Sequence, residues 1–568
     1  MADLLGKADR LMYPERVATG VGRQVHNARV LARAGLIAPL RPDKVARSIW
    51  LFRRWGASAA GAISISAVRY PDEPAIIDEL GTLTYRQLHR RTNALAHALR
   101  ADGIDARDNV AVMCRNHRYF IEATVALSKL GASTLYLNTE FAGPQIADVA
   151  NREGASALIF DSEFEGLMSD ARRGRRSYIA WQEDQASGPT LQQMIDRGDP
   201  GDLSPPAASG RVVILTSGTT GSPKGAARSQ PKNLDPAVSM LSRIPLRARE
   251  KTLVSAPLFH SWGFAHFSLG LVLATTYVLQ RRFDPEMALA AITRHRPTAM
   301  AVVPVMLQRM QQLPDKVRRK HDTSSLRVVA VSGSALPGEL ANAFMDQYGD
   351  VLYNLYGSTE VAWATIATPD DLRAAPGTAG RPPRGTVIRL FDERNNEVPP
   401  GQTGRIFVSN EFLFEGYTDG GSKASIEGLV ATGDVGQLDK AGRLFVEGRD
   451  DEMIVSGGEN VYPAEVEDLI SRHPGVAEVA IIGVRDPDFG QRLKAFVVPK
   501  GKKPSEEQIK AYVKSNLARY KVPRDVEFVK ELPRNATGKV IKRELAQRQQ
   551  QPDPEPPPQK RGAKRSRA

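Results

Sequence analysis

The chain has 568 residues, 42% of them apolar and 25% charged, which predicts a soluble globular protein of two or more domains. Its net charge of +13 lies mostly at the two ends: residues 1–60 hold 11 Lys/Arg against 4 Asp/Glu, and residues 546–568 hold 6 against 2. The long body between them has a net charge of only +2, which excludes nucleic acid as the main partner, because binding a phosphate backbone needs a basic face.

The apolar stretches are too short to cross a membrane, since a spanning helix needs about 18 uninterrupted apolar residues. The best candidate, FSLGLVLATTYVLQ, is shorter and lies between His266 and Arg281. The N-terminus has no apolar signal core, so secretion is not expected. The single cysteine, Cys114, fits a reducing cytoplasm and is expected to be a buried, inert thiol.

The first segment, residues 1–60, is predicted to be a basic helical arm. Val17, Val21, Val25 and Ala28 recur at helical spacing, and the segment RSIWLFRRWG places aromatic residues beside arginines. One interpretation is an arm packed on the body with its charged face in water. The other is a peripheral contact with the inner face of an anionic membrane, because arginine beside tryptophan suits a membrane surface.

From Thr84 onward the chain alternates between helical and strand patterns. Such alternation indicates α/β layers around parallel sheets. The predicted helices cover residues 84–104 and 116–132, and the predicted strands cover residues 109–114, 133–137 and 156–161.

After Pro376 the chain changes to short strands separated by Gly/Pro turns, which predicts a small β-barrel subdomain. Residues 61–450 are therefore expected to form the large domain. Residues 451–545 mix helix and strand signals around their own apolar positions and are expected to form a small α+β domain. Residues 546–568 have almost nothing apolar to bury and are expected to be a disordered basic tail.

The stretch LTSGTTGSPKGA (215–226) has the composition of a phosphate-binding loop. Gly218, Gly221 and Gly225 let backbone amides turn towards an anion, while hydroxyl side chains and Lys224 add donors. A Walker-type loop needs Lys and Ser/Thr adjacent after the last Gly. Here Lys224 lies between Pro223 and Gly225, so this is a different kind of nucleotide loop.

Four more stretches accompany this loop. They are NLYGSTE (354–360), ATGD (431–434), GRDDEMIVSGGENVYPAEVE (448–467) and LPRNATGK (532–539). Together, in this order and spacing, the five stretches resemble the adenylate-forming enzymes: acyl-CoA synthetases, luciferases and the adenylation domains of peptide synthetases. The resemblance covers residues from about 70 to about 545. It implies a large N-terminal domain of two α/β layers plus a small β-barrel subdomain, and then a mobile α+β domain.

The resemblance also implies ATP, Mg²⁺ and the co-substrate CoA, and it assigns roles to residues. Asp434 and Arg449 would bind the ribose, Tyr356 would stack on adenine, and Thr359 would contact the α-phosphate. Mg²⁺ would bind at Glu360 and Thr219. The nucleotide-binding residues implied are Ser217, Gly218, Thr219, Thr220, Gly221, Lys224, Gly333, Ser334, Ala335, Asn354, Tyr356, Gly357, Ser358, Thr359, Asp434 and Arg449.

The implied catalytic residues are Lys539, Glu360 and Thr216. Attack of a carboxylate on the α-phosphate gathers negative charge, and a positioned ammonium such as that of Lys539 stabilises the transition state. The family rotates its small domain about a hinge, which corresponds to Asp451, so that Gly457 and Gly458 line the thiol channel. The family usually has Asp after the hinge residue, where this chain has Glu452, and we expect this change to be tolerated.

The segment APLFHSWGFAHFSLGLVLA (256–274) resembles the acyl-pocket region of the family. Its candidate pocket residues are His260, Trp262 and Phe264, although His260 has an equally simple reading as a structural histidine. The segment has no Asp or Lys to pair with a substrate amine, which disfavours an amino acid. Phe264 stands where some long-chain enzymes have a gating tryptophan, so acyl chain length stays open.

The expected function is a fatty acid–CoA ligase for medium or long chains. The alternatives are a ligase that loads a carrier protein and an aryl-acid–CoA ligase. A luciferase-like oxygenase and a non-catalytic, membrane-associated lipid binder belong to other classes. The sequence leaves the oligomeric state open, a homodimer being one option.

Overall fold

The computed structural model describes residues 20–37, 39–183, 188–216, 224–228, 231, 233–456, 459–486, 490–535 and 538–548. The chain divides into two compact units. The first comprises the residues up to Asp450 together with Gly538, and the second comprises residues 451–535 and those from Lys539 onward. No helix in the described part of the chain is long and apolar enough to cross a membrane. The sequence predicts a disordered tail at residues 546–568, but residues 546–548 belong to the helix α18 (Lys542–Arg548). Residues 549–568, and residues 1–19 at the start of the arm, lie outside the described residues.

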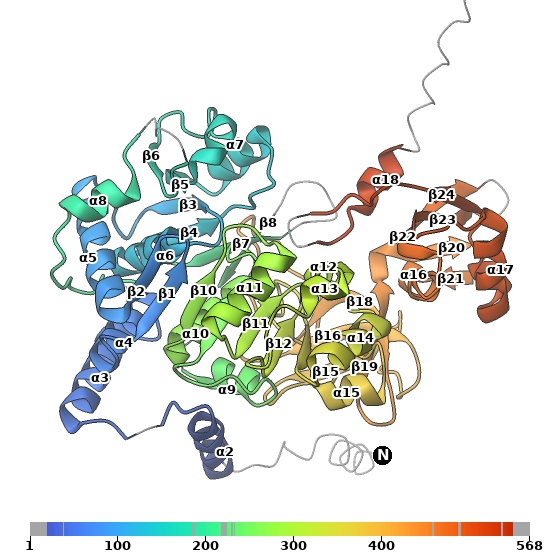
Figure 1. Cartoon of the computed structure of the whole chain (residues 1–568), viewed down its shortest axis with the longest axis horizontal. Coiled ribbons are helices and arrows are strands. Elements are labelled where there is room, and N and C mark those ends of the chain that lie inside the picture. Colours follow the sequence, from blue (N-terminus) through green and yellow to red (C-terminus); the bar gives the residue numbers. More distant parts are fainter. Residues whose placement is uncertain are drawn as a thin grey trace, which may run out of the picture. The chain divides into compact units, whose positions relative to one another are not determined.

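The first unit contains two sheets in which most neighbouring strands are parallel (Figure 1). The six-stranded sheet has the order β6 (Arg176–Ile179), β5 (Ala155–Phe160), β3 (Asn109–Met113), β4 (Ser133–Tyr136), β7 (Val212–Thr216), β8 (Lys224–Arg228). Its edge strand β8 alone runs antiparallel to its neighbour. The expected strands at 109–114, 133–137 and 156–161 are confirmed within one or two residues.

The second sheet of this unit has eight strands and is parallel except at its two edges. Its order is β14 (Thr365–Ala367), β13 (Leu352–Tyr356), β12 (Val328–Val331), β11 (Ala299–Val302), β9 (Lys251–Val254), β10 (Thr276–Leu279), β1 (Pro74–Asp78), β2 (Gly81–Thr84). Most of its strands are short and apolar with no exposed position, as is typical of a parallel sheet covered on both faces.

Helices cover both sheets. In chain order, those of the large domain body are α5 (Tyr85–Ala101), α6 (Arg118–Leu130), α7 (Gly143–Arg152), α8 (Leu191–Arg197), α9 (Asp235–Leu241), α10 (Ser261–Leu273), α11 (Pro285–His295), α12 (Pro304–Gln312), α13 (Asp315–Arg318), α14 (Gly338–Tyr348) and α15 (Pro369–Ala374). The predicted helices at 84–104 and 116–132 are confirmed as α5 and α6. A capping box at Thr84 begins α5, and Gly131 in the left-handed region ends α6.

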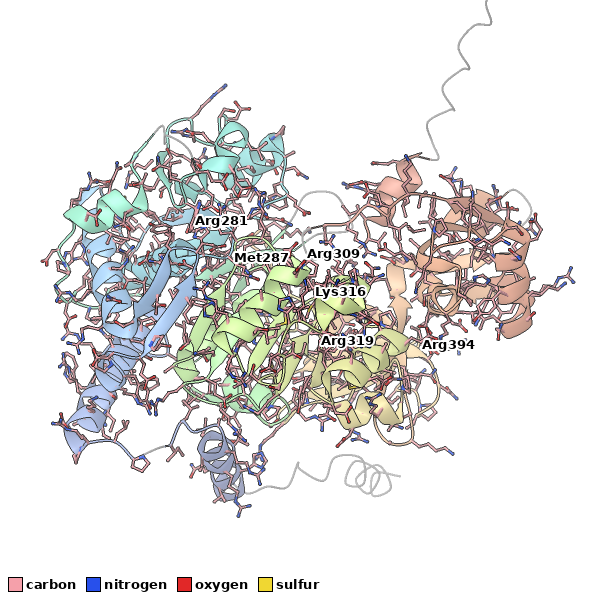
Figure 2. All side chains as sticks on the ribbon, viewed as in Figure 1. Arg281, Met287, Arg309, Lys316, Arg319 and Arg394 are labelled. Atoms are coloured by element: carbon pink, nitrogen blue, oxygen red, sulfur yellow. The ribbon has the colours of Figure 1, made fainter. Side chains whose placement is uncertain are left out.

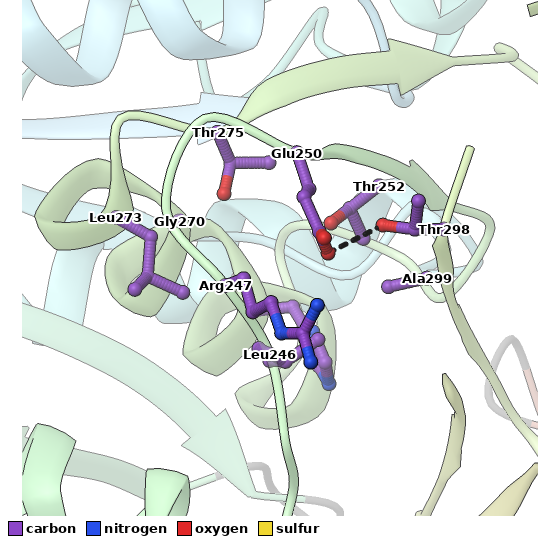
Figure 3. Close-up of a pocket in the computed structure, with 10 residues that line it drawn as sticks. Leu246, Arg247, Glu250, Thr252, Gly270, Leu273, Thr275, Thr298 and Ala299 are labelled. Carbon is purple, nitrogen blue, oxygen red and sulfur yellow. Dashed lines mark hydrogen bonds between the residues drawn. The ribbon is translucent and has the colours of Figure 1, made fainter. Parts of the chain in front are cut away.

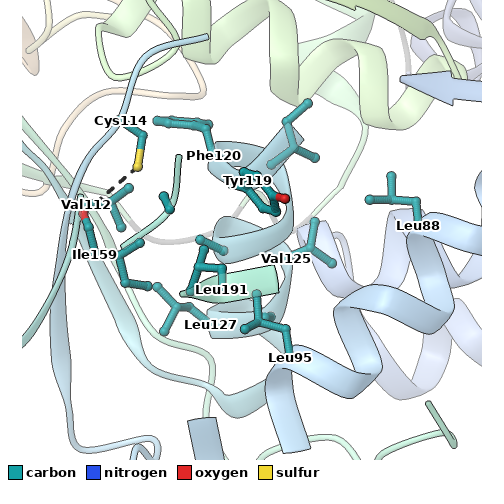
Figure 4. Packing of buried hydrophobic residues seen from close by; sticks show 14 of the residues in the cluster. Leu88, Leu95, Val112, Cys114, Tyr119, Phe120, Val125, Leu127, Ile159 and Leu191 are labelled. Atoms are coloured by element: carbon teal, nitrogen blue, oxygen red, sulfur yellow. Dashed lines mark hydrogen bonds between the residues drawn. The ribbon is translucent and has the colours of Figure 1, made fainter. Parts of the chain in front are cut away.

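One hydrophobic core joins α5, α6 and α10 to strands of both sheets. Leu88 and Leu95 of α5 are fully buried there, and they belong with Phe120 of α6 to the cluster drawn in Figure 4. Cys114 belongs to the same cluster and is also fully buried, so burial raises the pKa of its thiol well above its ordinary value. The predicted burial of this thiol is therefore confirmed, and its inertness stays a prediction.

The basic arm is helical where it is described. It consists of α2 (Gly20–Arg33) and α3 (Pro42–Trp55), followed by α4 (Ala59–Arg69), which leads into the body. Helix α2 packs on α9, and Asn27 Nδ2 donates a hydrogen bond to Asp235 Oδ1 at 2.7 Å.

The expected β subdomain is a five-stranded antiparallel sheet. Strands β17 and β19 both pair with β18, and no pairing joins β15 to β19 among the described residues, so the sheet is open rather than a closed barrel. Its strands are β15 (Val387–Phe391), β16 (Gly404–Ser409), β17 (Ser425–Ile426), β18 (Leu429–Leu438) and β19 (Leu444–Arg449).

The second unit has its own sheet and its own core. The sheet order is β21 (Glu459–Val461), β20 (Ile454–Ser456), β23 (Gly490–Pro499), β22 (Val476–Asp486), with β24 (Asp525–Phe528) also on β23. Helices α16 (Pro463–Ser471) and α17 (Glu506–Asn516) contribute Ile470 and Ile509 to the core, and α18 (Lys542–Arg548) ends the described chain. This is the α+β architecture expected for the C-terminal part.

Candidate active site

Several predicted segments follow the carboxyl ends of parallel strands in the eight-stranded sheet, so they meet at that end of the sheet. β9 leads to His260, β12 leads to Gly333, and β13 leads to residues 357–360. Ser261 Oγ and Thr359 Oγ1 lie 3.0 Å apart, which joins two of these segments. Ligands of parallel α/β sheets bind at this end of the strands, and the structure therefore gathers the candidate residues where a ligand site is expected.

The glycines at this end of the sheet have two different structural causes. Gly333 has φ +101°, a backbone conformation that favours glycine, and Ser334 and Ala335 follow it in the same turn. Gly357 is instead required by close packing, because a Cβ there would lie 2.4 Å from the carbonyl oxygen of Ala362. The close approach predicted at Gly357 is thus to the chain itself.

Asp434 receives partners from two directions. The Tyr356 hydroxyl, at the end of β13, donates a hydrogen bond to Asp434 Oδ2 at 2.6 Å. Arg449 lies opposite Asp434 across the β18–β19 ladder, with Nη1 3.6 Å from Oδ1. Burial and the neighbouring Asp434 carboxylate raise the pKa of Tyr356, so its hydroxyl stays a donor. The structure thus brings the predicted ribose pair together, with Asn354 buried two residues before Tyr356 in β13.

Glu360 is 8% exposed and accepts a hydrogen bond on Oε1 from the Tyr417 hydroxyl at 2.6 Å. Arg228, at the end of β8, donates through Nη2 to the carbonyl oxygen of Thr359 and lies over the Phe412 ring at 5.1 Å. Burial lowers the pKa of Arg228 to about 10, and the Glu360 carboxylate opposes that shift. The Ser358 hydroxyl accepts from the Glu360 amide at 3.3 Å, so the whole Ser358–Glu360 segment is held in place.

Tyr417 and Arg228 are functional candidates that the sequence patterns do not reveal. Tyr417 lies in EGYTDGG (415–421), whose glycines and acids indicate only a turn. Its ring also lies 5.3 Å from Lys224 Nζ, and Asp419 Oδ2 pairs with Lys224 at 3.2 Å. This turn therefore contacts both the lysine of the glycine-rich loop and the candidate magnesium ligand.

The glycine-rich loop connects two paired strands. Thr216 ends β7 and pairs in register with Lys224, which begins β8. Ser217, Gly218, Thr219, Thr220 and Gly221 lie outside the described residues, and their assignment stays a prediction. Gly225 has a packing role, because a Cβ there would lie 2.6 Å from Thr418 Oγ1. Packing thus gives a second reason for glycine at this position, and its predicted role towards an anion stays a prediction.

The candidate acyl residues lie in and beside α10. His260 precedes the helix as its N-cap, and burial lowers the pKa of its imidazole to about 4, so the ring is neutral. Trp262 is 4% exposed and donates from Nε1 to the carbonyl oxygen of Val302 at 2.9 Å. Phe264 belongs to a different hydrophobic cluster and packs against Tyr136 with ring centroids 5.1 Å apart. The two side chains therefore belong to separate clusters, and their common role in an acyl pocket stays a prediction.

A small hollow lies at the other end of the strands of the eight-stranded sheet, near the amino ends of β9, β10 and β11 (Figure 3). Glu250 Oε2 accepts hydrogen bonds there from Thr298 Oγ1 at 2.7 Å and from Arg327 Nη2 at 2.5 Å. These pairs tie neighbouring strands together. None of the predicted site residues lines this hollow, so we interpret it as structural.

The second unit carries the other predicted residues. Lys539 is exposed, and its backbone amide donates to Asn535 Oδ1 at 2.9 Å. Asp451 lies in a short 3-10 turn at the start of the unit, while Gly457 and Gly458 lie outside the described residues. Glu452 pairs with Lys542 Nζ at 3.2 Å, so the longer acid at this position has a partner within its own unit.

The side chains around Glu360 suit a hard cation. The Glu360 carboxylate and the adjacent Thr359 and Ser261 hydroxyls are all oxygen donors, which Mg²⁺ prefers. Tyr417 occupies one of about four lone-pair positions of the carboxylate. The residues present therefore fit the metal that the resemblance implies, while the second expected ligand, Thr219, lies outside the described residues.

Comparison with known proteins agrees with this arrangement. Residues 63–418 match the AMP-binding enzyme family, and residues 465–539 match the AMP-binding enzyme C-terminal domain. A feruloyl-CoA synthase from Amycolatopsis sp is 35% identical over 476 residues, which cover 82% of this chain and 94% of that protein. A fatty acid–[acyl-carrier-protein] ligase from Streptomyces coeruleorubidus is 30% identical over 497 residues, covering 85% and 95%.

Among solved structures, an anthranilate CoA ligase in complex with anthranoyl-AMP has a TM-score of 0.78 with this chain. The two share 26% sequence identity, and the match covers 86% of this chain and 97% of that one. The likeness thus extends over both units, whereas the family match begins at residue 63, after α2 and α3.

Proposed function

Because this chain belongs to the AMP-binding, adenylate-forming enzyme family, we propose that it activates a ring-bearing carboxylic acid as acyl-AMP and transfers the acyl group to CoA. ATP and CoA are the co-substrates and Mg²⁺ is the metal cofactor of such ligases. The proposal replaces the expected medium- or long-chain fatty acid by an aromatic or other cyclic acid.

The support for adenylation is the joint position of Glu360, Asp434 and Arg449. Tyr356 ends β13 and donates a hydrogen bond to Asp434. Glu360, the candidate magnesium ligand, follows Tyr356 by four residues. The end of β13 therefore positions both Asp434 and Glu360. When bound, Mg²⁺ would neutralise charge on the phosphates. Asp434 and Arg449 would orient the ribose, and Lys224 would bind the outer phosphates.

The reaction has two steps. A carboxylate oxygen of the acid attacks the α-phosphorus of ATP, and the bond to pyrophosphate breaks. The CoA sulfur then attacks the acyl carbon, its proton is lost to solvent, and AMP leaves. Lys539 would stabilise the charge of the first step.

The observation that supports the substrate class is the half-buried aromatic ring of Phe264 on α10, which has no charged neighbour in its segment 256–274. Phe264 packs with Tyr136, and the neutral His260 adds no charge. Planar rings stack favourably on such side chains. The feruloyl-CoA synthase and the anthranilate ligase bear the names of aromatic acids, which supports the same class.

A fatty acid loaded onto a carrier protein is the second candidate. It is favoured by the likeness to the Streptomyces coeruleorubidus ligase, which is named for a fatty acid and a carrier protein. An apolar segment without Asp or Lys at 256–274 accepts an alkyl chain as well as a ring.

The test is a pyrophosphate-release assay on the full chain with a panel of acids. The panel would contain benzoates, cinnamates, indole acids and straight-chain fatty acids of increasing length, each with and without CoA. We expect release with ring-bearing acids and an acyl-CoA product detected by mass spectrometry. Turnover only with fatty acids would replace the proposed substrate class, and formation of ADP with every acid would contradict acyl-adenylate chemistry itself.

A further inference from the structure

Helix α3 has one face on the body and an unusual face in water. Its inward positions recur at Lys44, Ser48, Leu51 and Trp55, which is helical spacing. Leu51 is 8% exposed, Trp55 packs on the large core, and Lys44 Nζ donates to the carbonyl oxygen of Arg69 at 2.9 Å. These contacts fix which side of the helix faces solvent.

The solvent side carries large apolar residues. Val45, Ile49 and Phe52 follow the i, i+4, i+7 spacing of a single stripe and are 39%, 50% and 42% exposed. Trp50 is 53% exposed and lies about 100° further round the helix than Ile49, on the other side of Arg53. Scattered exposed apolar residues are ordinary, but a contiguous stripe on one helix marks an interaction surface.

Cations share the solvent side of the helix: Arg53 borders the stripe, whereas Arg47 and Arg54 lie across the helix from it, next to Trp50. Arg47, Arg53 and Arg54 are exposed, and Arg54 lies over the Trp50 ring at 4.9 Å. Residues 41–55 hold five Lys/Arg against one acid, Asp43, which pairs with Arg41 at 3.1 Å. The partner that binds this face is therefore expected to have an anionic surface over an apolar interior.

We propose that α3 docks the protein peripherally on an anionic lipid bilayer surface. The helix has 14 residues, about 21 Å, which is too short to span a bilayer and suits a helix lying in the interface plane. The apolar stripe would enter the headgroup region while the arginines contact lipid phosphates. The helix precedes residue 63, where the family match begins, so docking is separate from the ligase machinery.

The geometry favours a bilayer over a protein partner. A membrane needs only exposed apolar side chains with cations among them. Helix α3 leads into α4 at the periphery of the first unit (Figure 1), and in the described part of the chain its apolar stripe is exposed. Tryptophan and arginine side chains at the same depth are typical of proteins at the interface between a membrane and water. A second copy of this basic helix would instead place like charges together.

The experiment is co-sedimentation of the full chain with vesicles, which measures docking without catalysis. Phosphatidylcholine vesicles with about 30% phosphatidylglycerol provide the anionic surface, and phosphatidylcholine alone provides the neutral one. We expect binding to the anionic vesicles that weakens with salt. Ile49→Ser/Phe52→Ser should abolish most binding, and R53E/R54E should weaken it at least about tenfold, since each surface cation contributes about a factor of five.

Matched variants control for general effects of polarity and charge. Leu80→Ser/Met287→Ser changes two residues that are 51% and 59% exposed elsewhere, and it should bind like the parent protein. K316E/R319E reverses two exposed cations at α13, whose side chains are visible in Figure 2, and should also bind normally. Equal loss in the control and α3 variants would overturn the proposal.

A fluorescence measurement separates insertion from loose charge attraction. Trp50 emission, taken as the difference between the parent protein and Trp50→Phe, should shift to shorter wavelength on anionic vesicles and be quenched by brominated lipid. No shift would contradict docking through α3. Absence of vesicle binding together with a dimer that the Ile49→Ser/Phe52→Ser variant dissociates would assign the face to a second copy of the chain instead.

Discussion

The hydroxyl of Tyr356 donates a 2.6 Å hydrogen bond to Oδ2 of Asp434, and this bond links the end of β13 to the middle of β18. Arg449 approaches the other carboxylate oxygen, Oδ1. The two oxygens of Asp434 thus have separate partners, which fixes the carboxylate plane before any ribose arrives.

We predict that Tyr356→Phe weakens binding of AMP. The aromatic ring remains, but the Asp434 carboxylate loses a charged hydrogen bond worth about 1.5–3 kcal/mol. Without this bond the carboxylate is less well oriented towards the ribose. The KM for ATP should rise about tenfold with a small change in kcat. Calorimetric titration with AMP would measure the loss directly.

The matched control for this variant is Tyr353→Phe. Tyr353 lies in the same strand, three residues earlier, and does not contact Asp434 through any hydrogen bond described in the structure. It should leave AMP affinity unchanged. If both variants lose the same affinity, the effect comes from the strand and not from the bond to Asp434.

Tyr417→Phe is predicted to raise the Mg²⁺ concentration needed for half-maximal adenylation. The variant removes the hydroxyl that holds Glu360 Oε1 but keeps the ring that lies 5.3 Å from Lys224 Nζ. Glu360 then becomes a less well oriented cation ligand. Removing a group that orients a metal ligand usually lowers metal affinity roughly 10–100-fold.

Asp419→Asn serves as the contrasting variant in the same turn. It weakens the pair with Lys224 and leaves the Tyr417–Glu360 bond in place. We expect it to change the KM for ATP while the Mg²⁺ dependence stays as in the parent protein. An unchanged Mg²⁺ titration in Tyr417→Phe would show that the tyrosine does not orient the metal ligand.

The helices and strands could be predicted from the sequence where their signals are local. α5 begins with the Thr84 and Gln87 capping box and ends close to Gly103, and α6 ends at Gly131. Caps, glycines and apolar spacing all lie within the element that they define. For the same reason the strands that follow these two helices are found within one or two residues.

The candidate site could be predicted only in part, because its remaining contacts are distant in sequence. Tyr417 reaches Glu360 across 57 residues, and Arg228 reaches Thr359 across 131. Helix α10 shows a second limit. It is apolar around its whole circumference, so no periodicity tells which face Trp262 and Phe264 occupy, and the structure places them in different clusters.

Lys539→Ala is predicted to separate the two half-reactions. The variant should lower adenylation by at least about a hundredfold, because removal of a group that stabilises the transition state typically costs 10²–10³. It should leave the transfer of a supplied acyl-AMP to CoA nearly unchanged. Lys530→Ala, an exposed lysine of the same unit, is the control and should affect neither step. Equal loss of both half-reactions would mean that the variant disturbs the unit and not the chemistry.

Lys129 gives a prediction about stability and pH. Its side chain is 1% exposed between α5 and α6, and Nζ donates to Thr92 Oγ1 at 2.8 Å, Asn93 Oδ1 at 2.5 Å and the His89 carbonyl oxygen at 3.2 Å. Burial lowers the pKa of this ammonium to about 7, although Asp202 opposes the shift. The unfolded chain, with an ordinary lysine pKa of about 10.4, then binds more protons than the folded chain between about pH 7 and pH 10.

The free energy of unfolding contributed by Lys129 should therefore rise with pH across this window, with a slope of at most about 1.4 kcal/mol per pH unit. Lys129→Met keeps an apolar stem without the charge. The free energy of unfolding of the parent minus that of Lys129→Met should therefore rise as the pH rises from 7 to 10. Titrating groups common to both proteins cancel in this difference. Chains of several domains unfold in steps, so the measurement is the denaturant midpoint of the transition that the variant shifts, taken from pH 7 to pH 10. Lys251→Met, another lysine that donates to a backbone carbonyl, is the control for the loss of an ammonium. A difference between parent and Lys129→Met that is independent of pH would show that the ammonium stays charged throughout, stabilised by its three acceptors.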